Sequence, residues 1–98
     1  MSALRVEWDD RKAVENRRKH SVSFEEANTV FSDEHALLID DPEHSDKEAR
    51  FVILGLSVAL RTLVVCHCYR KGGHVIRIIS ARKANRKERE LYNQRWHP

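Results

Sequence analysis

The chain has 98 residues, of which 41% are hydrophobic and 34% are charged. This length predicts one domain over residues 1–98 with a modest core, so no buried cofactor is expected and a functional site should be a surface or a groove. No apolar run approaches the roughly 20 residues of a membrane helix, and the N-terminus lacks the apolar stretch of a signal peptide. We therefore expect no membrane association and a cytoplasmic location.

Charge is divided unevenly along the chain. Residues 1–60 contain 8 Lys and Arg against 13 Asp and Glu, a net charge of −5, whereas residues 61–98 contain 10 against 2, a net charge of +8. The sum is +3. A basic C-terminal part suits a partner that carries phosphates, such as nucleic acid.

Apolar periodicity, capping signals and turn signals predict eight elements. In chain order they are a strand at 4–8, helices at 11–19 and 23–31, strands at 36–40, 50–57, 61–70 and 74–82, and a helix that begins after residue 85. Ser23 with Glu26, and Asn85 with Glu88, have the spacing of a capping box. The acidic segment at 40–46 contains a proline and is predicted to be a surface loop. The order β-α-α-β-β-β-β-α predicts an α+β fold with helices packed on one face of a mainly antiparallel sheet.

Cys66 and Cys68 flank His67 in a predicted strand. Strand neighbours two positions apart share a face but have poor geometry for a disulfide, so both cysteines are interpreted as reduced core residues. Because His67 would point to the opposite face, the three side chains cannot converge on one ion, and no metal site is predicted.

The uncovered face of the sheet is expected to carry the chemistry. In the strand at 61–70, Arg61, His67 and Tyr69 belong to one alternating set, which contains the reactive side chains. If the glycine turn pairs residue 70 with residue 74, Arg77 lies opposite His67 and joins that surface. A register that differs by one residue would move Arg77 to the other face.

Arginines around an imidazole and a phenol suit metal-independent cleavage of an RNA backbone. Arg61 and Arg77 would hold the phosphate and stabilise its developing charge, since guanidinium groups stay charged throughout. His67 would transfer protons, because imidazole titrates near neutral pH. RNA binding is predicted for Lys19, His20, Tyr69, Arg70 and Arg82.

Each assignment also has a structural interpretation. A strand arginine is usually solvated or salt-bridged, and a strand histidine often simply titrates on a surface. Tyr92 and Trp96, at helical spacing, are typical of core contacts, and the charge run from Lys83 to Arg95 is typical of a solvated helix face. The basic surface would equally serve a non-catalytic module that binds nucleic acid or regulates transcription.

Short motifs over most of the chain resemble the BrnT toxin family. They are Trp8-Asp9, Lys12-Ala13, Asn16, Lys19-His20, Val22 to Ala27, Val30-Phe31, His44-Ser45, Glu48-x-Arg50, Ile76 to Ala84, Glu88 and Tyr92, and they span about Val6 to Tyr92. The resemblance implies a RelE-like fold and a ribonuclease toxin of a type II toxin-antitoxin pair, which cuts RNA to arrest growth. It also implies neutralisation by a BrnA-type antitoxin, contact with operator DNA only through that antitoxin, and dimerisation of the toxin within the complex.

The resemblance matches the family's strand arginines to Arg61 and Arg77, its Ser-Ala-Arg segment to residues 80–82, and its Lys-His pair to residues 19–20. The family usually has glycine where this chain has Ser21 and Leu60. Because leucine tolerates positive φ poorly, we expect the turn before Arg61 to differ and Arg61 to shift. Ser21 likewise weakens the expectation of a tight turn at the helix end. A degenerate toxin that retains only antitoxin binding is the alternative that rests on Leu60.

Overall fold

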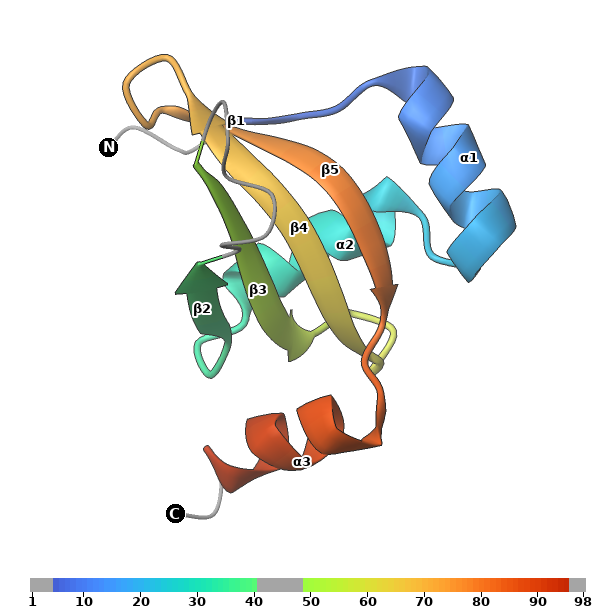
Figure 1. Cartoon of the computed structure of the whole chain (residues 1–98), viewed down its shortest axis with the longest axis vertical. Coiled ribbons are helices and arrows are strands. Elements are labelled where there is room, and N and C mark those ends of the chain that lie inside the picture. The colour runs from blue at the N-terminus through green and yellow to red at the C-terminus, as the bar shows by residue number, and fades with distance from the viewer. Residues whose placement is uncertain (1–4, 41–48, 96–98) are drawn as a thin grey trace.

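In a computed structural model of the chain, which describes residues 5–40 and 49–95, one five-stranded sheet is flanked by three α-helices (Figure 1). The elements are β1 (Arg5–Glu7), α1 (Asp10–His20), α2 (Phe24–Thr29), the 3-10 helix η1 (Val30–Ser32), β2 (Leu37–Asp40), β3 (Arg50–Leu56), β4 (Thr62–Arg70), β5 (Val75–Lys83) and α3 (Arg86–Gln94). Their order confirms the predicted α+β succession. Most of the predicted acidic loop lies outside the described residues, as does Trp96.

The strands are arranged in the order β1-β5-β4-β3-β2. β1 runs parallel to β5, and the other neighbours are antiparallel. α1 flanks β5, and α2 crosses behind the strands (Figure 1). The main core lies between these helices and the sheet, and its buried members are Val22, Phe24, Ala27, Val30, Ile53, Leu63, Val65, Ile78 and Ala81. The set of β4 that includes residues 63 and 65 therefore faces the helices.

α3 packs on the other face of the sheet, at one end. Tyr92 of α3 belongs to a second buried cluster with Leu54, Val64 and Ala84, and its hydroxyl donates a hydrogen bond to Asp33 Oδ2 at 2.6 Å. The expectation that all helices cover one face is wrong for α3. The physical reason is that the strands are apolar on both faces at this end, so both faces need cover.

The β4–β5 hairpin has a register one residue away from the predicted one. Arg70 pairs with Val75 rather than His74, because three successive turn residues, Lys71, Gly72 and Gly73, adopt positive φ and the turn takes in His74. Arg77 consequently lies opposite Cys68. His67 lies opposite Ile78, so Arg77 and His67 are on opposite faces of the sheet.

Candidate nucleic-acid interface

The face of the sheet opposite α1 and α2, here called the open face, presents arginines from β3 and β5. Cys68 of β4 pairs with Arg50 on one side and with Arg77 on the other, so the three residues form a row across the strands. Farther along β5, Arg82 pairs with Val64 and Ser80 with Cys66, on the same face. Within the described residues, a depression of about 330 Å³ lies here, lined by Arg50, Val52, Val64, Cys66, Ile79, Ser80 and Arg82.

The open-face arginines differ in how they are held. Arg77 Nη1 donates to Glu7 Oε2 at 2.7 Å, and both side chains are about one-third exposed, at 29% and 33%. Arg82 donates to both carboxylate oxygens of Glu88, at 2.8 and 2.9 Å, and this hydrogen bonding lowers the pKa of Glu88. Arg50 Nε is buried and has no acceptor among the described residues. A solvent-accessible ion pair with a single hydrogen bond, such as Arg77–Glu7, contributes only about 0–1 kcal/mol, whereas the two hydrogen bonds of Arg82 to Glu88 hold that pair more firmly.

A second depression, of about 180 Å³, borders the open face along α1. It is lined by Lys12, Glu15, Asn16, Lys19, His20, Ile79 and Ser80. The two depressions share Ile79 and Ser80, so the basic end of α1 adjoins the open-face arginines. Lys19 lies 3.8 Å from a Glu15 carboxylate oxygen, and both side chains are exposed. The structure thus brings together Lys19, His20 and Arg82 of the predicted site residues.

His67 and Tyr69 belong to the covered set of β4. His67 has 0% of its surface exposed, and its ring packs edge-on against Phe31. Its Nδ1 lies 3.2 Å from Val65 O, and because a carbonyl only accepts, Nδ1 carries the proton. Burial lowers the pKa of His67, and Nε2 is buried without a hydrogen-bond partner in the part of the chain that the structure describes. The predicted surface shared by His67 and Arg77 is therefore wrong.

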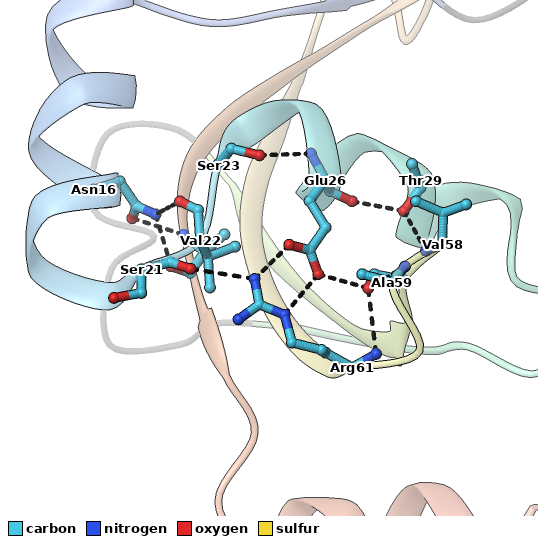
Figure 2. A network of polar contacts seen from close by, with 11 residues as sticks. Asn16, Ser21, Val22, Ser23, Glu26, Thr29, Val58, Ala59 and Arg61 are labelled. Carbon is cyan, nitrogen blue, oxygen red and sulfur yellow. Dashed lines mark hydrogen bonds and ion pairs between the residues drawn. The ribbon is translucent and has the colours of Figure 1, made fainter.

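Arg61 also lies away from the open face, in a polar network that joins α2 to the β3–β4 turn (Figure 2). Its guanidinium forms a two-pronged ion pair with Glu26, including Nε to Oε2 at 2.9 Å, and Nη2 donates to Ser21 O at 3.2 Å. Ser57 Oγ donates to the same carboxylate at 2.7 Å. The hydrogen bond from Arg61 holds the pKa of Glu26 below its usual value. Tyr69 and Arg70 lie at the far, hairpin end of β4, so the predicted site residues are divided among four places.

Comparison with known proteins decides the family. A family model described as "Ribonuclease toxin, BrnT, of type II toxin-antitoxin system" matches residues 8–88. The chain belongs to the BrnT family. Among solved structures it is similar to the crystal structure of the Brucella abortus ribonuclease toxin BrnT, with 22% identity, a TM-score of 0.61, and coverage of 86% of this chain and 100% of that chain. No curated protein matches.

The structural similarity confirms the mixed α+β fold with a mostly antiparallel sheet. The RelE-like label stays a prediction. As a BrnT family member, the chain is a ribonuclease toxin of a type II toxin-antitoxin system, for which an antitoxin partner and an RNA substrate are implied. No described helix is long and apolar enough to cross a membrane.

The two positions at which this BrnT family member departs from glycine keep the backbone that glycine favours. Leu60 adopts φ 62° and Ser21 adopts φ 57°. The amide of Leu60 donates to Ser57 O, and that of Ser21 donates to Arg17 O, both at 2.9 Å. Leu60 thus adopts the left-handed backbone that leucine tolerates poorly, and the hydrogen bond to Ser57 O helps to hold it in a conformation that costs an L-residue about 1–2 kcal/mol.

Arg50 is the open-face residue that the sequence reasoning did not place in the site. It alternates with Val52 and Leu54 along β3, and this pattern would have assigned it to one face with them. A metal centre was not expected, and within residues 5–40 and 49–95 no three His, Cys, Asp or Glu side chains lie close enough to hold an ion.

Proposed function

We propose that this BrnT family member is a metal-independent endoribonuclease that binds its RNA across the open face. The observation that carries the proposal is the row formed by Arg50 and Arg77 across β4, continued by Arg82 on the same face. An exposed sheet with fixed cations is a suitable surface for a single-stranded backbone. The basic edge of α1, with Lys19 and His20, extends this surface.

The chemistry assigned to this surface is attack of a ribose 2′-hydroxyl on the adjacent phosphorus. The new oxygen–phosphorus bond forms as the bond to the 5′-oxygen breaks, the 2′-hydroxyl loses its proton, and the leaving oxygen gains one. Arg77 and Arg82 stabilise the charge that develops on the phosphate oxygens. His20, exposed and adjacent to Ser80, is the proton-transfer residue in this proposal. His67 is displaced from that role because it is enclosed beneath Phe31.

Metal independence is supported by the character of the groups around the site. The side chains there include the cations Arg50, Arg82 and Lys19, and the carboxylates of Glu15 and Glu88 are paired with Lys19 and Arg82. Such cationic groups supply positive charge to a transition state themselves, whereas a divalent cation prefers carboxylate and carbonyl oxygens.

The partners proposed for the chain follow from its family. A BrnA-type antitoxin would neutralise the toxin and would carry the contact with operator DNA. We also propose that the toxin dimerises within that complex and acts in the cytoplasm. A non-catalytic nucleic-acid-binding module remains the rival function, because arginines on a sheet bind phosphates whether or not cleavage follows.

The test is cleavage of RNA by purified protein in EDTA, with Arg77→Ala, Arg82→Ala and Arg17→Ala compared. Arg17 is the matched control, since it is exposed on α1 and lines a separate depression with Trp8 and Phe24. We expect cleavage by the wild type and by Arg17→Ala, and a loss of about 100-fold or more in the two open-face variants. RNA that stays intact while it is bound by the wild type would favour the non-catalytic module. Full activity of both open-face variants would refute the proposed site.

A further inference from the structure

A β-bulge determines which residues of β5 share the open face. Arg77 and Arg82 are five positions apart, and in a regular strand an odd separation puts two side chains on opposite faces. The pairing of β4 with β5 shifts between Cys66 and His67, which leaves Ile79 as an extra residue. The bulge therefore brings Arg82 to the same face as Arg77.

Beyond Arg77, the outer edge of β5 has no neighbouring strand in the described part of the chain, because β1 pairs only with residues 75–77. The backbone of Ala81, just past the bulge, is nevertheless paired. Its N–H donates to Asn16 Oδ1 at 3.0 Å, and its carbonyl accepts from Asn16 Nδ2 at 2.8 Å. A carboxamide has the same donor and acceptor as a peptide group, so Asn16 takes the place of a strand at this point.

Asn16 is itself held in place. Its side chain is buried, with 6% of the residue exposed, and Nδ2 also donates to Val22 O at 2.9 Å, in the segment that leads from α1 to α2 (Figure 2). Three hydrogen bonds thus join α1 to β5 and to the segment between α1 and α2. If β5 slipped by one residue, the Asn16 carboxamide would lose its match to Ala81, and Ser80 or Arg82 would turn toward the core. Both changes leave buried polar groups unpaired.

We propose that Asn16 is a positioning residue that fixes the register of β5 after the bulge, and so keeps Ser80 and Arg82 beside Arg77. The inference rests on the proposed function, because the register matters for cleavage only if the open face binds the scissile phosphate. The register itself is a separate property that can be measured without RNA.

The experiment compares the full chain with Asn16→Ala and with Asn16→Asp, which keeps the acceptor for Ala81 N–H but loses both donated hydrogen bonds. Val30→Ala is the control, since Val30 is fully buried in the main core and belongs to neither depression. Cross-strand nuclear Overhauser contacts between residues 64 and 82 report the register. Amide hydrogen exchange reports protection of residues 79–83, and cleavage is measured well below the unfolding temperature.

We expect both Asn16 variants to lose the 64–82 contact and to exchange amides 79–83 at least tenfold faster relative to β3. The kcat of RNA cleavage by both Asn16 variants should fall at least tenfold. Val30→Ala should keep the contact and the cleavage rate of its folded fraction. If both Asn16 variants fail to fold, exchange in the wild type decides: the Ala81 amide should be as protected as those of β4, and fast exchange would overturn the proposal.

Unchanged register and cleavage in folded Asn16 variants would also overturn it. A wild type that does not cleave RNA would refute the proposed function, yet the register measurement would still decide the role of Asn16.

Discussion

The imidazole of His67 packs edge-on against the ring of Phe31, with ring centroids 4.9 Å apart and an interplanar angle of 90°. The rings of Phe51 and Tyr69 lie within 6.2 and 5.4 Å of the same imidazole. This enclosure disfavours the charged imidazole and lowers the pKa of His67, because the charged form would be desolvated and no described carboxylate pairs with it.

The first prediction concerns the pH dependence that this burial creates. Burial lowers the pKa of His67 in the folded state, so the unfolded chain, with a histidine pKa of about 6.5, binds more protons below that pH. The contribution of neutral His67 to the free energy of unfolding is therefore fully present above about pH 6.5. It falls at lower pH by up to about 1.4 kcal/mol per pH unit. We expect His67→Leu to remove this dependence, so that its free energy of unfolding relative to the wild type rises by about 1 kcal/mol between pH 7.5 and 5.5.

Urea denaturation at the two pH values measures that difference. The pH dependence that the other histidines contribute cancels, because both proteins contain them. The same variant tests the catalytic role first predicted for His67. We expect His67→Leu to cleave RNA at nearly the wild-type rate. A loss of about 100-fold or more in a folded variant would restore His67 as a proton-transfer residue.

The second prediction concerns the Arg61–Glu26 ion pair, whose side chains are 33% and 14% exposed. Arg61→Ala leaves the half-buried carboxylate with only its Ser57 hydrogen bond, and we expect a loss of about 1.5–3 kcal/mol in the free energy of unfolding. Arg61→Lys keeps the charge but loses the two-pronged geometry, so an intermediate loss is expected. A double-mutant cycle with Glu26→Gln measures the coupling, and a coupling near zero would contradict a structural role.

Local signals in the sequence were sufficient where one residue contacts a near neighbour. Asn85 and Glu88 form the predicted capping box, and Ser23 caps α2 as predicted. The face of β4 could not be predicted in the same way, because both of its alternating sets are apolar. One set has Leu63 and Val65 and the other Val64 and Cys68, so the pattern does not say which set the helices cover.

The register of the β4–β5 hairpin could not be predicted from the sequence for a related reason. The hairpin turn is one residue longer than the glycines indicated, and the bulge at Ile79 has no glycine or proline to mark it. The backbone just past the bulge bonds a residue far along the chain, Asn16, which lies 65 positions before Ala81. The sequence could therefore not say which residues share a face with Arg77, because that depends on the turn length and on the bulge, which are visible only in the fold.

The third prediction follows from the positive φ of Leu60. Its side chain is 79% exposed, so removal of the side chain sacrifices little burial. Leu60→Gly relieves about 1–2 kcal/mol of left-handed strain, but glycine also raises the conformational entropy of the unfolded chain, which destabilises the fold by about 0.5–1 kcal/mol. We therefore expect a net stabilisation of roughly 0.5–1 kcal/mol. Ala59→Gly is the matched control, because Ala59 is an exposed neighbour without positive φ and should lose about 0.5–1 kcal/mol. Equal effects of the two substitutions in urea denaturation would show that strain at Leu60 is negligible.

The fourth prediction uses salt to count phosphate contacts on the open face. Binding of 2′-O-methyl RNA, which cannot be cleaved by 2′-hydroxyl attack, should weaken as salt rises, and the logarithmic slope should change by about 0.7 for each single-strand phosphate contact that is removed. We expect Arg77→Ala and Arg82→Ala each to reduce the slope by about that amount, whereas Arg17→Ala should leave it unchanged. Arg77→Lys should keep the slope, because the charge remains, but should slow cleavage of unmodified RNA, because a lysine offers no planar fork to a phosphate. If Arg17→Ala lowers the slope as much as the open-face substitutions do, binding is diffuse over the basic surface and the open face has no special part in it.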